Sequence, residues 1–254
     1  MTEALRVTPV RGLAEISPGD RLGELIARAV EEERRELGEE DVVVVAQKAV
    51  SKAEGRVRDL RDVKAGEEAR ALANRMHKDP RLVELVLRES REVIRAERDV
   101  LIVETTGGWI CANAGIDASN VPGQETVTLL PEDPDISARR IRKEVAATAG
   151  VRPAVVVSDS FGRPWRLGQA DVAIGCAGLA PLDDWRGRSD REGRELAATV
   201  VAVADEAAAV ADLARAKDAG IPVCLLRGLG GFVTADDGPG ARALQRPRHE
   251  DLFR

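Results

Sequence analysis

The stretch that decides the fold is Pro153-Ala-Val-Val-Val-Ser-Asp-Ser-Phe-Gly-Arg-Pro-Trp-Arg166. Its apolar first part predicts a β-strand, and this strand runs directly into Asp159. Proteins that mix strands with helices often place ligand-binding groups at the carboxyl ends of strands. The dense polar second part therefore has two interpretations. It is either a binding site or a strand-ending turn, whose arginines would form surface ion pairs of little energetic value.

The polar part of this stretch holds groups that suit a metal ion and an anion. Asp159 and Ser160 offer a carboxylate and a hydroxyl, and Mg²⁺ and Mn²⁺ prefer such oxygen ligands. Arg163 and Arg166 offer guanidinium groups, which pair well with phosphates and carboxylates. On this interpretation, we expect both arginines to be catalytic residues that meet the anionic groups of a substrate.

Two other polar segments have the same two kinds of interpretation. Ala114-Gly-Ile-Asp-Ala-Ser-Asn120 contains a carboxylate suited to a divalent metal and an amide suited to a phosphate, base or sugar. The alternative is an Asx-turn, in which Asp117 or Asn120 bonds only local backbone. Gln47-Lys-Ala-Val-Ser-Lys52 follows an apolar run and presents lysines that suit phosphates. The alternative for this second segment is a solvated loop.

The rest of the chain mixes helices and strands without regular alternation. Asp41-Val-Val-Val-Val-Ala46 predicts a strand buried on both faces of a sheet. Further strands are expected near residues 5–10, 100–104, 125–130 and 221–226, and helices over 66–77, 81–92, 136–149 and 193–216. We therefore predict the α+β class, with mixed sheets in two intermixed lobes and residues 1–254 forming a single domain.

Composition and charge limit the remaining classes. The net charge of −6 disfavours general nucleic-acid binding, because the phosphate backbone favours basic surfaces. No apolar run approaches the roughly 20 residues that span a bilayer, and the first residues lack the apolar core of a signal peptide. We therefore expect a cytoplasmic protein without a membrane partner. The three cysteines form no close pair, and neither histidine has an evident serine or cysteine partner, which disfavours a zinc site and a hydrolase triad.

Taken together, these segments resemble the coenzyme F420-0 gamma-glutamyl ligase family. The resemblance extends from residue 5 to about residue 230 and depends on the order of the segments as well as on their residues. The matching stretches are Pro9-Val-Arg-Gly-Leu-Ala-Glu-Ile16 with Pro18-Gly-Asp20, Lys48-Ala-Val-Ser-Lys-Ala-Glu-Gly-Arg56, Ala114 to Asn120, Ser158 to Arg166, and Gly168-Gln-Ala-Asp-Val-Ala-Ile-Gly175.

The resemblance implies a reaction and a set of site residues. GTP would phosphorylate the terminal carboxylate of coenzyme F420-0, and the amine of L-glutamate would then attack the acyl phosphate. A second round would add a gamma-linked glutamate to coenzyme F420-1. Mg²⁺ or Mn²⁺, an assisting K⁺ and a homodimer are also implied. The implied metal ligands are Asp117, Asp159 and Ser160, and the implied nucleotide contacts are Leu13, Ala14, Glu15, Ile16, Gln47, Lys52 and Asn120.

The chain departs from the family pattern at several positions. Family members often carry a His or Ser where Gln47 stands and a Thr where Ser160 stands, and both replacements keep a polar contact. Ala214-Arg-Ala-Lys217 replaces a Gly-Gln pair that contributes to nucleotide and metal binding in many members, so the second metal site stays open. A fused nitroreductase-like domain is not expected. Two alternative functions stay open, a non-catalytic nucleotide-binding regulator and a ligase for another carboxylate acceptor.

Overall fold

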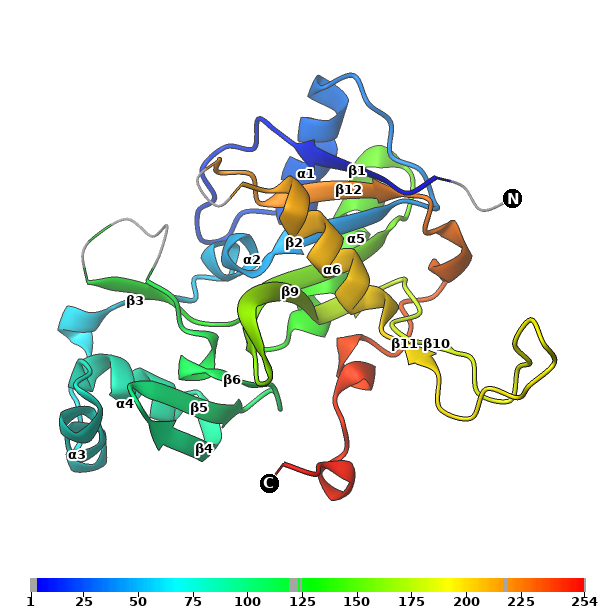
Figure 1. The fold of residues 1–254 in the computed structure, drawn as a ribbon. Helices are drawn as coiled ribbons and strands as arrows, with labels where there is room; N and C mark the ends of the chain where they lie inside the picture. The colour runs from blue at the N-terminus through cyan, green and yellow to red at the C-terminus, as the bar shows by residue number, and fades with distance from the viewer. Residues whose placement is uncertain (1–3, 119–122, 124, 217–218, 254) are drawn as a thin grey trace.

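A five-stranded sheet lies at the centre of the computed structural model of the chain, which describes residues 4–118, 123, 125–216 and 219–253 (Figure 1). Its strand order is β1 (Arg6–Val10), β12 (Val223–Arg227), β2 (Val42–Ala46), β8 (Ala154–Arg163) and β9 (Arg166–Ala177). The pair β2–β8 is parallel and the other neighbouring pairs are antiparallel, so the sheet is mixed.

The parallel pairing of β2 with β8 decides where the polar segments meet. Ala46 lies opposite Ser158 at the last register position of this pair. Beyond it, the chain after β2 enters helix α2 (Gln47–Ala53), while β8 continues into a hairpin with β9. Parallel neighbours end at the same edge of a sheet. The residues that follow Ala46 and Ser158 are therefore brought together at one edge.

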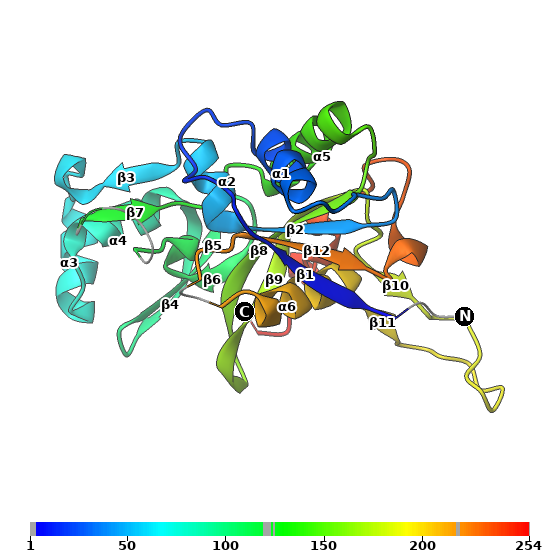
Figure 2. The ribbon, with the colours of Figure 1, turned by 90° about the horizontal axis from the view of Figure 1, so that it is seen from above.

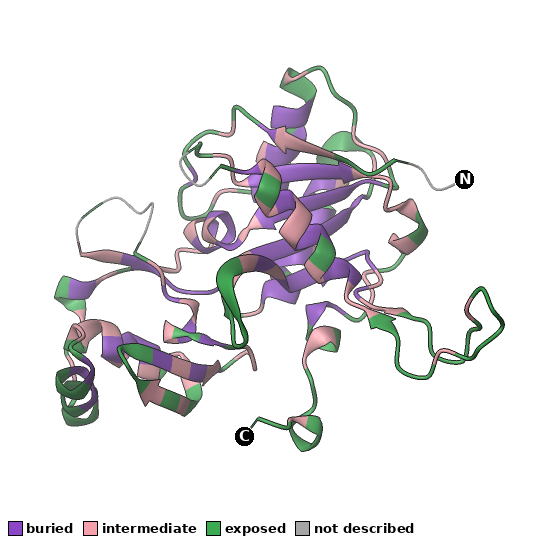
Figure 3. Cartoon of the chain, viewed as in Figure 1, coloured by how far each residue is buried: buried purple, intermediate pink, exposed green. Residues whose placement is uncertain are grey.

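Helices cover both faces of this sheet (Figures 1 and 2). α1 (Leu22–Glu32) and α5 (Pro134–Ala149) pack against one face, and the alanine-rich α6 (Val203–Ala214) packs against the other. Alternate valines of β2 point to opposite faces, so the hydrophobic clusters on the two faces both draw on this strand. Its valines are at most 1% exposed, which confirms the predicted strand buried on both faces. Figure 3 shows the same burial along the central strands.

The contact between α1 and α5 leaves no room for a side chain at Gly23. The backbone N–H of Gly23 donates to Oε2 of Glu144 at 2.9 Å. A Cβ atom on Gly23 would lie 2.4 Å from the carbonyl oxygen of Ile141. Real Cβ atoms do not approach backbone oxygens so closely, so this glycine permits the close packing of the two helices.

A third hydrophobic cluster lies apart from the five-stranded sheet, at the left of Figure 1. The elements around it are α3 (Glu67–Met76), α4 (Pro80–Arg88) and the sheet of β4 (Ser90–Glu97), β5 (Val100–Thr105) and β6 (Ile110–Ala112). A separate antiparallel pair joins β3 (Val57–Asp59) to β7 (Thr126–Thr128). The mixed architecture with several sheets is confirmed, whereas the two lobes, the single domain and the homodimer stay predictions.

The predicted helix over residues 193–216 is wrong over residues 193–202, because α6 begins only at Val203. Gly193 has a positive φ of 80°, and the Asp190 carboxylate accepts two nearby backbone N–H groups in a turn. Farther on, β11 (Val200–Val201) pairs with β10 (Asp183–Asp184). Adjacent β-branched residues favour this extended backbone, so only the alanine-rich part of the segment becomes helical.

Other boundaries differ by smaller amounts. The predicted helix over 81–92 ends at Arg88, because Ser90 already pairs with Thr105 in a sheet. The short 3₁₀ helices are η1 (Leu60–Asp62), η2 (Asn113–Gly115), η3 (Gly230–Phe232), η4 (Ala241–Leu244) and η5 (Arg248–Glu250). Within the described ranges, no helix combines the length and the apolar character needed to cross a bilayer.

Candidate functional site

A cavity of about 730 Å³ lies at the edge of the sheet where β2 and β8 part. Segments far apart in the sequence form its wall, among them residues 13–16, 46–49, 111–117, 158–162 and 212–222 in part. The strand ends and the start of α2 bring polar groups to this edge, because the apolar parts of the same segments are held in the core.

Most of the residues that the sequence singled out line this cavity. They are Leu13, Ala14, Glu15, Ile16, Gln47, Lys52, Asp117, Asp159 and Ser160. Asn120 lies outside the described residues, so its predicted nucleotide contact stays a prediction. The cavity therefore gathers the metal ligands and nearly all of the nucleotide contacts that the family resemblance implies.

The two arginines expected to be catalytic lie elsewhere. Arg163 and Arg166 flank the turn between β8 and β9, and the described cavity wall includes neither of them. The guanidinium of Arg163 donates to the carbonyl oxygen of Leu167 at 2.7 Å, within the same hairpin. Their predicted contact with a substrate anion stays a prediction, and it would require a ligand that reaches from the cavity to the hairpin turn.

Asp159 is the most perturbed carboxylate of the cavity. Burial in the protein raises its pKa to about 7, because a desolvated carboxylate resists ionisation. The backbone N–H of Ser160 lowers the pKa, the nearby charges of Asp171 and Asp117 raise it, and Lys48 lowers it. A cation bound beside Asp159 would relieve the repulsion between its carboxylate and those of Asp117 and Asp171.

Helix α2 points two lysines into the cavity, one helical turn apart. Nζ of Lys48 lies 2.8 Å from Oδ2 of Asp117, and Nζ of Lys52 lies 2.6 Å from Oε1 of Glu15. Residues four positions apart share a helix face, so both ammonium groups face the same side. The sequence pattern left phosphate binding and a solvated loop both open for this segment, and the structure shows a helix. Lys48 is a second candidate for phosphate binding beside Lys52.

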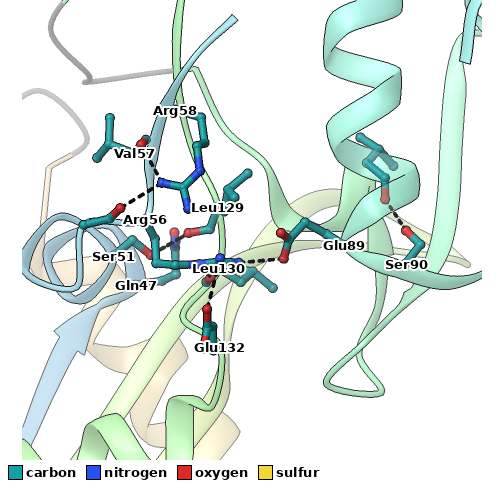
Figure 4. Close-up of polar contacts among 12 residues, drawn as sticks. Gln47, Ser51, Arg56, Val57, Arg58, Glu89, Ser90, Leu129, Leu130 and Glu132 are labelled. Carbon is teal, nitrogen blue, oxygen red and sulfur yellow. Dashed lines mark hydrogen bonds and ion pairs between the residues drawn. The ribbon is translucent and has the colours of Figure 1, made fainter. Parts of the chain in front are cut away.

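Gln47 anchors the start of α2 to the chain that follows β7 (Figure 4). Its Nε2 donates to Oγ of Ser51 at 2.6 Å and to the carbonyl oxygen of Leu129 at 3.0 Å. Nearby, Arg56 donates to the carbonyl oxygen of Leu130 at 2.9 Å and to Glu89 at 2.6 Å. The bonds of Gln47 tie the start of α2 to the chain that follows β7, and those of Arg56 join the same stretch of chain to Glu89.

Sequence reasoning missed two charged residues in the cavity wall. Asp171 lies on β9 opposite Ser160, and Arg215 follows the end of α6. Nη2 of Arg215 lies 2.5 Å from Oδ2 of Asp171, and both side chains are buried. Asp171 falls inside a segment that matches the family, and Arg215 falls inside the segment that departs from it. The sequence around Asp171 and Arg215 contains no local pattern that predicts their contact, because the two residues lie 44 positions apart.

The donor set of the cavity suits a hard divalent cation. Asp117 and Asp159 supply carboxylate oxygens and Ser160 supplies a hydroxyl. The described residues include no group of three or more His, Cys, Asp or Glu side chains arranged to hold a metal. A cation here would thus take its remaining ligands from water and from a substrate, as Mg²⁺ does at sites shared with phosphates.

The chain matches known proteins along nearly all of its length. A family model described as F420-0:gamma-glutamyl ligase matches residues 12–228. A coenzyme F420:L-glutamate ligase of Methanothermobacter thermautotrophicus is 44% identical over 246 residues, which cover 96% of this chain and 97% of that protein. A protein of the same name from Methanopyrus kandleri is 44% identical, and the match covers 98% of this chain and 98% of that protein. Another from Halorubrum lacusprofundi is 49% identical, and the match covers 86% of this chain and 85% of that protein.

Proposed function

Because the chain belongs to the F420-0:gamma-glutamyl ligase family, we propose that it joins L-glutamate to coenzyme F420-0 through an amide bond. GTP is the proposed energy source, and a second, gamma-linked glutamate is added to coenzyme F420-1. Mg²⁺ or Mn²⁺ is the proposed divalent cofactor, with K⁺ as an assisting ion. A cytoplasmic homodimer is the proposed working form.

The proposed reaction has two steps. The terminal carboxylate of the acceptor attacks the γ-phosphorus of GTP, which forms an acyl phosphate and releases GDP. The amine of L-glutamate then attacks the carbonyl carbon of the acyl phosphate, inorganic phosphate leaves, and the nitrogen loses a proton. Phosphorylation is needed because a free carboxylate has no adequate leaving group. Such chemistry depends on positioning and charge neutralisation more than on covalent catalysis.

One observation carries this proposal. A single cavity collects Lys48, Lys52, Asp117, Asp159 and Ser160 from separate segments of the chain. Lys48 and Lys52 bind phosphate oxygens, and the backbone of residues 13–16 contributes nucleotide contacts. Asp117, Asp159 and Ser160 would hold the divalent ion, which when bound neutralises charge on the phosphates.

The direct test measures the mass of the product. Incubation with coenzyme F420-0, GTP, L-glutamate and Mg²⁺ is expected to increase the acceptor mass by one glutamyl residue, with one GDP released per bond. Omission of L-glutamate or addition of a chelator serves as the control. Asp159→Asn is expected to abolish product formation, with the fold preserved by circular dichroism. Absence of glutamyl addition by the parent protein would refute the proposal.

The same experiment separates the two alternative functions. A regulatory protein would bind GTP without releasing GDP at any acceptor concentration. A ligase with another acceptor would release GDP and form an amide only with a different carboxylate from a tested panel. Stoichiometric GDP release that depends on coenzyme F420-0 rules out both alternatives.

A further inference from the structure

The carboxylate of Asp171 sits at the centre of a buried polar network beside the metal ligands. Its Oδ1 accepts the hydroxyl of Ser160 at 2.6 Å, and its Oδ2 accepts the hydroxyl of Ser158 at 2.9 Å. Nη2 of Arg215 donates to the same Oδ2 at 2.5 Å and to Oγ of Ser158 at 2.9 Å. The carboxylate thus has one oxygen directed to Ser160 and the other directed to Arg215.

We propose that Asp171, held in place by Arg215, is a positioning residue that fixes the Ser160 hydroxyl as a lone-pair donor toward a divalent cation. The inference rests on the proposed function, since it takes Ser160 as a metal ligand. It adds to that function two residues, Asp171 and Arg215, whose role is to orient a ligand without touching the metal.

The chemistry of a serine hydroxyl explains the need for such a partner. A hydroxyl carries one proton and two lone pairs, and it rotates freely unless a partner fixes it. A carboxylate can only accept, so the Ser160 proton must point at Oδ1 of Asp171. The lone pairs of Ser160 then face away from Asp171. Partners of this kind commonly set the orientation and basicity of metal ligands.

Arg215 explains why Asp171 can serve in this role while buried. Asp171 and Arg215 are only 5% and 8% exposed, and an unpaired charge at such a depth is strongly disfavoured. The guanidinium compensates the carboxylate and occupies Oδ2. Asp171 is thereby held in one orientation and kept from turning its second oxygen toward a cation. A further contact of Arg215, to the carbonyl oxygen of Pro222 at 3.4 Å, comes from the chain before β12.

The isosteric variant Asp171→Asn tests the proposal because Arg215 dictates its orientation. Arg215 can only donate, so the amide oxygen of the asparagine must face it. The amide NH₂ group then faces Ser160 and donates into a lone pair that the cation needs. We expect the affinity for Mn²⁺, titrated by electron paramagnetic resonance on the nucleotide-free chain, to fall about 10- to 100-fold.

Two serine variants make the readout specific. Ser158→Ala removes a hydroxyl that shares Oδ2 of Asp171 with Arg215 and does not bond Ser160, so it should weaken Mn²⁺ binding less than Ser160→Ala does. Ser160→Ala should lower the affinity for Mn²⁺ about as much as Asp171→Asn does. The double variant S160A/D171N should lose no more affinity than either single variant, because both substitutions act through one hydroxyl. Where Asp171→Asn alone does not fold, the variant D171A/R215Q removes both charges together, leaves the Ser160 hydroxyl without its acceptor, and is expected to weaken Mn²⁺ binding as well.

The outcomes separate this inference from the proposed function. If Ser160→Ala weakens Mn²⁺ binding and a folded Asp171 variant does not, the positioning role of Asp171 is wrong and the metal site stands. If Ser160→Ala leaves Mn²⁺ affinity unchanged, Ser160 is not a ligand, and the proposed metal set fails with the inference. Additive losses in the double variant would show that Asp171 acts by another route, such as charge, and would overturn the inference.

Discussion

Replacing Lys48 with methionine should weaken GTP binding while leaving the fold nearly as stable. Methionine keeps the length of the side chain but removes the ammonium group that we propose binds phosphate. Lys48 loses its ion pair with Asp117, whose side chain is 46% exposed. Ion pairs of such exposure contribute about 0–1 kcal/mol, so the free energy of unfolding should fall by no more than about 1 kcal/mol.

The effect on the nucleotide should be larger. A hydrogen bond to a charged partner contributes about 1.5–3 kcal/mol. One factor of ten corresponds to about 1.4 kcal/mol, so the dissociation constant for GTP should rise roughly 10- to 150-fold. Isothermal titration calorimetry at a fixed salt concentration measures this constant, and urea unfolding measures the stability. Salt must be fixed because screening weakens contacts between charges.

Lys143→Met is the matched control, because Lys143 is exposed on α5 and its replacement changes the net charge by the same amount. Its dissociation constant for GTP should stay within threefold of the parent value. An equally small change in Lys48→Met would show that Lys48 does not bind phosphate. A loss of stability above about 2 kcal/mol would show that the ion pair with Asp117 is structural, contrary to the exposure argument.

Further predictions concern helix packing, the cysteines and the two hairpin arginines. Gly23→Ala should destabilise the fold by about 1–3 kcal/mol in urea unfolding, because its Cβ would meet the Ile141 carbonyl at 2.4 Å, whereas Gly231→Ala, with nothing within 4 Å, should not. Burial raises the pKa of the three cysteine thiols from 9.0 to about 11 or 12, so native protein should resist iodoacetamide at pH 8.5. Just above pH 9 these thiols ionise in the unfolded chain but not in the folded protein. The free energy of unfolding should therefore fall as the pH rises above 9, and a urea midpoint that stays constant would contradict this. Arg163→Met and Arg166→Met should raise KM for the acceptor without changing GTP affinity, and an unchanged KM in both would remove these arginines from the substrate site.

Local patterns were sufficient to predict four of the five central strands and several helices, but they did not predict β9. The valine runs of β2 and β8 are apolar at every position, as strands covered on both faces require, and both strands form where they were expected. α5 ends at Gly150, which adopts the left-handed conformation that glycine favours at a helix end. The long helix expected from residue 193 was wrong in its first part, because composition averaged over the segment concealed the turn near Asp190 and the strand at Val200–Val201.

The sequence by itself indicated which short segments supply polar groups to the cavity, because carboxylates, hydroxyls and lysines after apolar runs form local patterns. The joint order of these segments identified the family. Tertiary structure alone decided which charges meet. Asp171 reaches Ser160 through the antiparallel register of β8 and β9, and Arg215 reaches both Asp171 and Ser158 from the end of α6. Strand register and helix packing depend on burying apolar surface across the whole chain. No local pattern encodes them, and the network behind the Ser160 hydroxyl therefore emerged only from the fold.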